Sequence, residues 1–189
     1  MRALFAGLLF AMIGCGPADA GSPVASDRAE TRTTGQLAVA SEAFSRGGAI
    51  PLRYSAYGDG LSPPLTWTGS PSDTRSHVLL VEDPDATSVR PYIHWMTWNI
   101  DSGTRSLPEG VRPTAAGMVQ GRNSRGRTGW FGPRPHGNSA HRYFFQVFAL
   151  DTELVLPATS SRNDLLGAMK GHVLAAGTLI GTFRQPGRR

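Results

Sequence analysis

Short apolar runs separated by turn-forming residues constrain the fold of this chain more than any other feature. Such runs occupy residues 37–40, 65–67, 77–81, 94–100, 143–150 and 179–183, and most are bounded by Gly, Pro, Ser or Asp. Runs of this length and composition are typical of β-strands. Glycine (23 residues) and proline (14 residues) are frequent in the 189-residue chain, which favours short strands and turns over a helical bundle. We therefore expect one β-dominated domain.

One helix is expected near the C-terminus. The segment Ser-Arg-Asn-Asp at residues 161–164 has the form of a capping box. Leu165, Leu166 and Met169 follow it with the spacing of one helical face, and Gly171 is a typical stop signal.

The first residues have the features of an export signal. A positively charged start precedes an apolar run over residues 3–13, which is too short to span a bilayer stably. The letters M-I-G-C at residues 12–15 resemble a bacterial lipoprotein box, whereas A-D-A at residues 18–20 offers an ordinary cleavage site. We expect residues 1–15 to be a signal peptide with a lipobox and Cys15, the one cysteine, to carry the lipid.

This interpretation places the protein in the cell envelope as a lipoprotein that faces the periplasm. Cleavage after Ala20 would instead give a secreted or periplasmic protein. Residues 16–36 are rich in small and polar residues, which predicts a flexible tether. We expect the folded domain to span residues 37–184, followed by a basic tail at 185–189.

The formal charge of +5 comes almost entirely from arginine, because Lys170 is the only lysine among 19 basic residues. A basic surface is compatible with nucleic acid, anionic lipid or acidic partners. Export makes nucleic acid an unsuitable partner, and composition alone does not distinguish between anionic lipid and acidic partners.

Three segments combine titratable side chains with turns or strands. Residues 83–86, Asp-Pro-Asp-Ala, follow an apolar strand. Residues 94–99, His-Trp-Met-Thr-Trp-Asn, are a strand in which period-two alternation places His94 on one face with Met96 and Trp98. A Gly- and Pro-rich loop at residues 129–137 then precedes the strand that begins His141-Arg142-Tyr143, where His141 and Tyr143 share a face.

The order D-P-D-A, H-W-x-x-x-N, G-x-x-G-P-x-P-x-G and H-R-Y-x-F-x-V-x-A-L-D resembles the bacterial branch of the phosphatidylethanolamine-binding protein family, also called the Raf kinase inhibitor protein family. With the segments 165–174 and 179–183, the resemblance covers nearly all of residues 37–184. It implies a mainly β fold of antiparallel sheets packed as a sandwich with a few short helices, and a shallow cavity near one end.

The resemblance also implies the residues of a ligand site. Asp83, His94, His141 and Tyr143 are expected to line the cavity, while Asp85, Ala86 and Pro133 are expected to shape its rim. In this family the cavity takes phosphate, acetate or the head group of phosphatidylethanolamine, without catalytic turnover.

One departure from the family pattern lies in the Gly- and Pro-rich loop. Arg134 stands where bacterial relatives often carry cysteine, and the loop has one proline fewer. The Arg134 side chain could assist anion binding in the cavity or could lie in solvent, and the sequence leaves both alternatives open.

The residue types support an anion site on physical grounds. A carboxylate beside an imidazole favours the charged ring, so we expect Asp83 to raise the histidine pKa and make His94 and His141 donors to anionic oxygens. Tyr143 adds a hydroxyl donor. Residues 121–143 contain five arginines and no acidic residue, so the loops over the site should be electropositive.

The sequence therefore predicts a non-catalytic protein that binds a small anionic ligand or phospholipid head group, with no cofactor and no metal. The alternative is a protease or kinase inhibitor that acts through protein–protein contacts. A metal-dependent hydrolase is the weaker class, because the sequence contains no H-E-x-x-H, C-x-x-C or G-x-S-x-G motif. His77, His136 and His172 are interpreted as structural residues.

Overall fold

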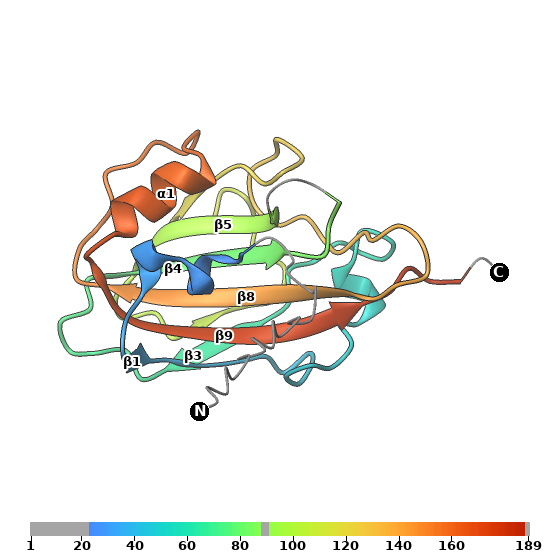
Figure 1. Ribbon diagram of the computed structural model, residues 1–189, viewed down its shortest axis with the longest axis horizontal. Coiled ribbons are helices and arrows are strands. Elements are labelled where there is room, and N and C mark those ends of the chain that lie inside the picture. Colours follow the sequence, from blue (N-terminus) through green and yellow to red (C-terminus); the bar gives the residue numbers. More distant parts are fainter. Residues whose placement is uncertain (1–22, 88–90, 188–189) are drawn as a thin grey trace, which may run out of the picture.

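Two β-sheets form the framework of the computed structural model, which describes residues 23–87 and 91–187 (Figure 1). The larger sheet has the strand order β1-β9-β8-β4-β5-β7, and the smaller sheet has the order β2-β3-β6. The strands of the larger sheet are β1 (Gly35–Gln36), β9 (Val173–Phe183), β8 (His141–Leu150), β4 (Ser76–Asp83), β5 (Tyr92–Asp101) and β7 (Val119–Gln120). Those of the smaller sheet are β2 (Ala38–Ala40), β3 (Leu65–Thr68) and β6 (Ser106–Leu107).

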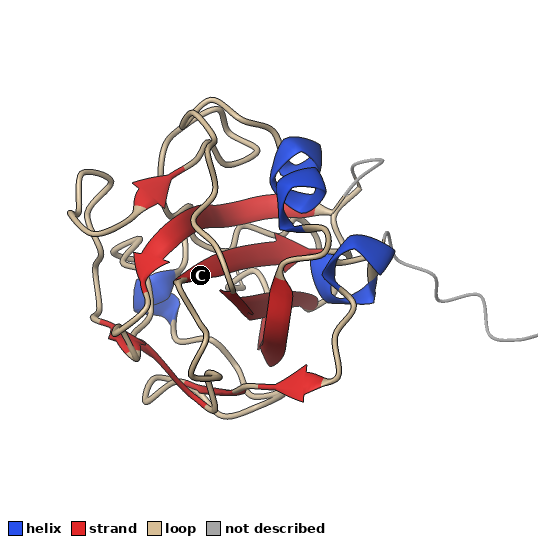
Figure 2. Ribbon diagram, turned by 90° about the vertical axis from the view of Figure 1, so that its left-hand side faces the viewer, coloured by secondary structure: helices blue, strands red, loops and turns tan. Residues whose placement is uncertain are grey.

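The strand pairs are antiparallel except for β1, which runs parallel to β9. The helical elements are α1 (Arg162–Met169) and three short 3₁₀ turns, η1 (Ala25–Asp27), η2 (Ala29–Thr31) and η3 (Leu52–Tyr54). In Figure 2 some strands cross the middle of the view and others run along its lower edge.

The predicted helix is confirmed, together with its start. The Ser161 side chain accepts a hydrogen bond from the Asp164 amide, and the Asp164 carboxylate accepts one from the Ser161 amide, which completes a capping box. The two bonds satisfy amide groups that a helix start leaves without intrahelical partners. Leu165, Leu166 and Met169 are buried, so the predicted apolar face packs onto the protein.

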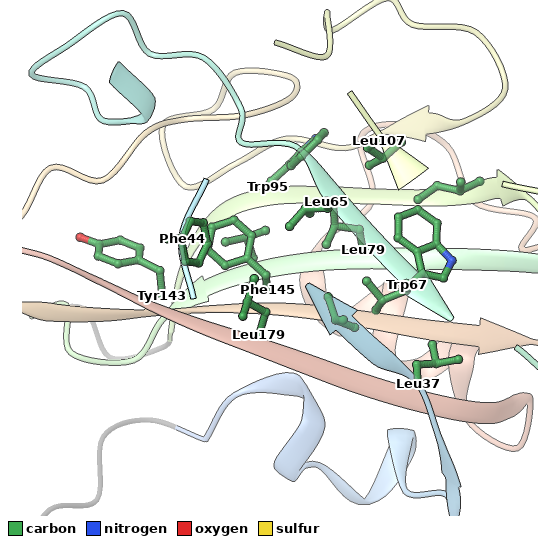
Figure 3. Close-up of a cluster of buried hydrophobic side chains, with 14 of the residues drawn as sticks. Leu37, Phe44, Leu65, Trp67, Leu79, Trp95, Leu107, Tyr143, Phe145 and Leu179 are labelled. Atoms are coloured by element: carbon green, nitrogen blue, oxygen red, sulfur yellow. The ribbon is translucent and has the colours of Figure 1, made fainter. Parts of the chain in front are cut away.

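The main apolar core lies between the two sheets. Alternate residues of the central strands face the smaller sheet, as expected from the two-residue period of a strand. Figure 3 shows part of this cluster, which includes Leu79 of β4, Trp95 of β5, Phe145 of β8 and Trp67 of β3. Each of these four side chains is almost completely buried.

A second apolar cluster lies on the opposite face of the larger sheet. Val78 and Leu80 of β4, Met96 of β5 and Phe148 of β8 pack there against the buried face of α1. The larger sheet is therefore covered on both faces, which explains why β4 is buried along its whole length.

The N-terminal segment (residues 23–33) packs on this second face, so the prediction of a free tether is wrong for these residues. Val24 and Ala25 are buried, and the Ala25 amide donates to the carboxylate of Glu82 at 2.7 Å. The Ser26 amide donates to the side-chain oxygen of Gln146 at 2.6 Å. Composition did not indicate this packing, because the segment is held mainly through its backbone.

The partners of this segment form a buried polar group. Glu82 is fully buried and accepts hydrogen bonds from the side chains of Gln146 and Arg162. Arg162 in turn donates to the carbonyl of Pro23 at 3.1 Å. A buried carboxylate needs such partners, because an unpaired one would be strongly destabilising.

The chain after β1 continues along the outer edge of β9. The amides of Leu37, Gly47 and Ile50 donate to carbonyls of β9, and the Arg46 guanidinium donates to the carbonyl of Thr178. Residues 37–50 therefore occupy hydrogen-bonding groups that a two-residue β1 leaves free.

The predicted mainly β fold is confirmed, with one parallel pair and one α-helix as detail. Cys15, the expected signal peptide and the cleavage site after Ala20 lie outside the described residues. No helix within 23–87 and 91–187 combines the length and apolar character needed to cross a membrane.

Candidate functional site

A cavity of about 300 Å³ opens where β4 ends and where β5 and β8 begin. Because these three neighbouring strands are antiparallel, the last residue of one and the first residues of the other two meet at the same end of the sheet. The cavity is lined by Asp83, Ala86, Thr87, Tyr92, His94, Arg125, Phe131, Arg134, Pro135, His136 and His141.

Asp83 and His141 form the polar floor of this cavity. The Nδ1 atom of His141 donates to the Asp83 carboxylate at 2.8 Å, and both side chains are largely buried. Burial is the largest influence on Asp83 and raises the pKa of its carboxyl, while the contact with His141 acts in the opposite direction. The second Asp83 oxygen accepts the Asp85 amide at 2.9 Å, which fixes the orientation of the carboxylate.

A β-bulge determines where His94 points. Val81 of β4 pairs with Trp95 of β5, but the next residue, Glu82, pairs with Ile93, so His94 is the extra residue. A bulge interrupts the alternation of side chains along a strand. The prediction that His94 shares a face with Met96 is therefore wrong.

The contacts of the two residues show the difference. Met96 belongs to the cluster under α1, whereas His94 lies against Phe131 and Tyr143 beside the cavity.

The ring of His94 is held in one orientation. Its Nδ1 atom lies 2.6 Å from the carbonyl oxygen of Phe131, and the Phe131 amide donates back to the carbonyl of His94 at 2.9 Å. The two rings are also stacked, with centroids 5.8 Å apart and an interplanar angle of 12°.

Burial lowers the pKa of His94 to about 4, with a smaller contribution of the same sign from the charge of His141. The expectation that a nearby carboxylate raises the pKa of this histidine is wrong, because burial dominates and outweighs the contact with the Phe131 carbonyl, which acts in the opposite direction. His94 is thus a neutral imidazole at pH 7, and its Nδ1 atom carries the proton. The Asp83 carboxylate instead binds the other imidazole, that of His141.

Tyr143 was expected to line the cavity, but it lies behind the lining residues with its side chain fully buried. In Figure 3 its oxygen points away from the other labelled side chains of the core cluster. Among the described residues, no group meets hydrogen-bond geometry with this hydroxyl. Burial and, secondly, the nearby Asp83 carboxylate raise the pKa of Tyr143, so it stays protonated at neutral pH.

The mouth of the cavity combines aromatic rings with arginines. Tyr92 lies beside His94, with ring centroids 5.1 Å apart, and the guanidinium of Arg125 lies 5.1 Å from the centre of the Phe131 ring. Arg134 lines the cavity and is exposed, so it can reach both a bound ligand and solvent. Two guanidinium groups therefore stand at the mouth of a cavity whose floor holds one carboxylate.

Two predicted rim residues do not line the cavity. Asp85 binds Arg142 through both carboxylate oxygens, with contacts of 2.6 to 2.9 Å that lower the pKa of Asp85. The carbonyl of Pro133 accepts the amide of Ala56 at 3.0 Å and anchors the loop from behind. In place of Pro133 it is Pro135 that lines the cavity.

Several lining residues were not singled out from the sequence: Thr87, Tyr92, Arg125, Phe131, Pro135 and His136. Arg125 was counted only as one member of an arginine-rich loop, and His136 was interpreted as structural although it is exposed at the cavity. The loop brings them to the site through folded contacts that no local pattern specifies.

The described part of the chain contains no group of three or more His, Cys, Asp or Glu side chains arranged to hold a metal ion. As far as the structure describes it, the site offers hydrogen-bond donors, a neutral acceptor, positive charge at the mouth and one carboxylate on the floor.

Comparisons with known proteins indicate one family. A family model described as "Phosphatidylethanolamine-binding protein" matches residues 40–184. A protein of Methanothermobacter thermautotrophicus named only as a UPF0098 protein is 44% identical over 149 residues, which are 77% of this chain and 97% of that protein.

Two solved structures are similar in fold. A phosphatidylethanolamine-binding protein homologue of Chlamydia trachomatis has a TM-score of 0.74 and 38% identity, and the match covers 81% of this chain and 100% of that chain. The E. coli protein YBCL, described as a member of the mammalian family, has a TM-score of 0.74 and 28% identity, with 80% and 99% covered.

Proposed function

The chain belongs to the phosphatidylethanolamine-binding protein family, and we propose that it is a non-catalytic binding protein whose cavity holds a small phosphorylated anion. The ligand class includes inorganic phosphate and the phosphoryl group of a phospholipid head group. The observation that carries this proposal is the pairing of a buried Asp83–His141 contact at the floor with Arg125 and Arg134 at the mouth.

The arginine charges account for affinity for a phosphoryl group, and the volume of the cavity limits the size of the ligand. Guanidinium groups bind phosphoryl oxygens through several donors at once, and such charge-assisted hydrogen bonds are the stronger ones in proteins. A cavity of about 300 Å³ accepts a head group but not a whole lipid, so acyl chains would remain outside.

The described residues of the cavity contain no serine or threonine hydroxyl paired with a histidine, which supports binding rather than turnover. His141 is bound to Asp83 and His94 to a backbone carbonyl, and neither contact among the described residues joins a base to a serine or threonine hydroxyl.

Isothermal titration with inorganic phosphate and with glycerophosphoethanolamine tests the proposal. We expect Arg134→Ala and Arg125→Ala each to weaken the binding of phosphate by roughly five- to tenfold, which corresponds to one charge-assisted contact. Arg105→Ala is the matched control, because Arg105 is exposed and bonds only to carbonyls of its own turn. Unchanged affinity in both cavity variants, or an equal loss in Arg105→Ala, would refute the assignment of the site.

The proposed location is the cell envelope, where the ligand would be met at a membrane surface. This location rests on the export signal and on the lipobox that ends at Cys15. The mass of the mature N-terminus distinguishes a lipidated Cys15 from a chain that begins at Gly21.

A further inference from the structure

The tautomer of His94 is determined by its surroundings. A carbonyl oxygen only accepts hydrogen bonds, so the contact of 2.6 Å to Phe131 requires a proton on Nδ1. A turn of the ring by 180° would break this bond, and the stacking with Phe131 and the edge-to-face contact with Tyr143 hold the ring in place. A neutral ring with a proton on Nδ1 has a lone pair on Nε2.

The remaining nitrogen is available to a ligand. His94 lines the cavity, and its ring makes no second hydrogen bond with the part of the chain that the structure describes. Nε2 is therefore a neutral acceptor in a cavity whose other polar groups include the donors of His141 and the two arginines and the Asp83 carboxylate, which already accepts from His141.

The groups around His94 do not favour a second proton on its ring. The titratable and charged groups that face it are Asp83 of β4, Tyr92 of β5, His141 and Tyr143 of β8, and Arg125, Arg134 and His136 of the loop between β7 and β8. The single carboxylate binds His141, whereas two guanidiniums lie at the cavity mouth. Burial, with a smaller contribution from the charge of His141, lowers the pKa of His94 to about 4 despite the opposing effect of the Phe131 carbonyl contact.

A fully deprotonated oxyanion fits such a site poorly. Its oxygens carry only lone pairs, so one oxygen placed at Nε2 would leave two acceptors facing each other without a hydrogen between them. An unpaired buried acceptor costs the free energy of its desolvation. Sulfate and phosphodiester groups carry no proton at neutral pH. A phosphate monoester, in contrast, keeps one proton up to a pH of about 6.

We propose that His94 selects the protonated form of the ligand, by accepting a hydrogen bond at Nε2 from the P–OH group of a phosphate monoester or of inorganic phosphate. The two anionic oxygens of the same group then face His141 and the arginines at the mouth. This inference rests on the proposed function and narrows its ligand class to inorganic phosphate and phosphate monoesters, since the phosphodiester of a phospholipid head group has no P–OH group at neutral pH.

Titrations across a pH series test the selection without any mutation. The probes are inorganic phosphate, methyl phosphate, sulfate and dimethyl phosphate, measured from pH 5 to 8.5 at constant ionic strength. We expect the affinity for phosphate and methyl phosphate to fall by about tenfold per pH unit above the second pKa of each ligand, because the bound form carries one proton more than the free dianion. Sulfate and dimethyl phosphate should bind about tenfold or more weakly than phosphate at pH 6.

One further ligand in the same titrations tests which group donates the hydrogen bond to Nε2 of His94. Glycerophosphoethanolamine is a phosphodiester that brings an ammonium group instead of a P–OH group. If it binds as tightly as phosphate at pH 6 and keeps its affinity at pH 8.5, the ammonium is the donor and the inference is overturned.

The His94→Phe variant removes the acceptor and keeps a ring that can stack on Phe131. We expect this variant to lose the discrimination between phosphate and sulfate, and to lose the decrease of affinity with pH. His172→Gln is the control, because it removes an exposed imidazole paired with Asp151, away from the cavity. The anion series on the unmodified protein decides the question if His94→Phe does not fold.

The outcomes separate this inference from the proposed function. If phosphate and sulfate bind equally and independently of pH, the cavity binds anions and the inference alone fails. If none of the four anions binds between pH 5 and 8.5, the proposed function is refuted, and the inference, which depends on it, is refuted too.

Discussion

The hydroxyl of Tyr143 is a polar atom that the fold buries without giving it a partner among the described residues. A buried, unpaired polar group destabilises the folded state, so natural proteins keep few of them. Its neighbours, Asp83 and His94, belong to the cavity. We therefore expect the Tyr143 hydroxyl to destabilise the folded state and to strengthen ligand binding.

We predict that Tyr143→Phe leaves the free energy of unfolding unchanged or raises it by up to about 1 kcal/mol, because the lost hydroxyl made no hydrogen bond. The same change should weaken phosphate binding by roughly five- to tenfold, if the hydroxyl turns to a bound ligand. Chemical denaturation and titration calorimetry measure the two effects on one sample.

Tyr54→Phe provides the comparison. The Tyr54 hydroxyl is also in a buried residue, but it donates to Glu109 at 2.6 Å and lies outside the cavity lining. Its loss should destabilise the protein by about 1 kcal/mol and leave phosphate affinity unchanged. If the two variants behave alike in both measurements, the role given to Tyr143 is wrong.

At the scale of single residues, the sequence indicated the position of the cavity better than the hydrogen bonds and protonation of its side chains. Asp83, His94 and His141, which the motifs single out, line one cavity. The bulge at His94 and the contact with the Phe131 carbonyl depend on the pairing of two strands and on a distant loop. No pattern within residues 94–99 contains that information, so the neutral state of His94 was not predictable from it.

Among the elements, the N-terminal segment departs most from expectation. Its backbone is held by Glu82, Gln146 and Arg162, and Ala25 is buried beside the Glu82 carboxylate. Small residues without an apolar pattern indicate a tether when only local composition is considered. The interactions that hold this segment come from residues more than 50 positions away.

We predict that Ala25→Asp destabilises the protein by roughly 2–4 kcal/mol, because it places a second carboxylate next to the buried Glu82. Limited trypsin digestion should then cleave faster at Arg28, since the segment no longer packs on the sheet. Thermal unfolding and the rate of cleavage measure the two effects.

Ser26→Asp is the matched control for this substitution. Ser26 is the next residue, its side chain is exposed, and its contact with Gln146 uses the backbone amide, which the variant keeps. We expect a change within about 0.5 kcal/mol. Equal destabilisation by the two aspartates would mean that burial of residue 25 beside Glu82 is not the cause of the effect.

The longer strands and α1 were predictable because their residues carry periodic apolar patterns or capping signals. The predicted segments 77–81, 94–100 and 143–150 fall inside β4, β5 and β8. The two-residue strands β6 and β7 were not predictable, since two residues have no period and pair only because the fold brings them to a sheet edge.

For the molecule as a whole, buried histidines set the response to acid. Burial lowers the pKa of both His77 and His94 from 6.5 to about 4. The folded state therefore binds fewer protons than the unfolded state between pH 6.5 and 4, so stability decreases as the pH falls through this range. The raised pKa of Asp83 acts in the opposite direction, since burial favours its protonated form in the folded state.

We predict a loss of about 3 kcal/mol for each of the two histidines between pH 7.5 and 4, with little change above pH 7. Denaturation midpoints measured in buffers without phosphate or acetate test this expectation. His77→Gln should reduce the pH dependence by about half, because it removes one of the two groups, whereas His172→Gln should not alter it. A midpoint that stays constant from pH 6.5 to 4.5 would contradict the prediction.

The edges of the larger sheet affect the tendency of this protein to self-associate. Its outermost strands, β1 and β7, have two residues each, and residues 37–50 already occupy the edge of β9. Fibre growth begins where one chain adds its backbone to the open flank of another, and a long unshielded strand is the usual starting point. A protein closed in this way can be crowded at a surface, and still resist forming amyloid through its folded state.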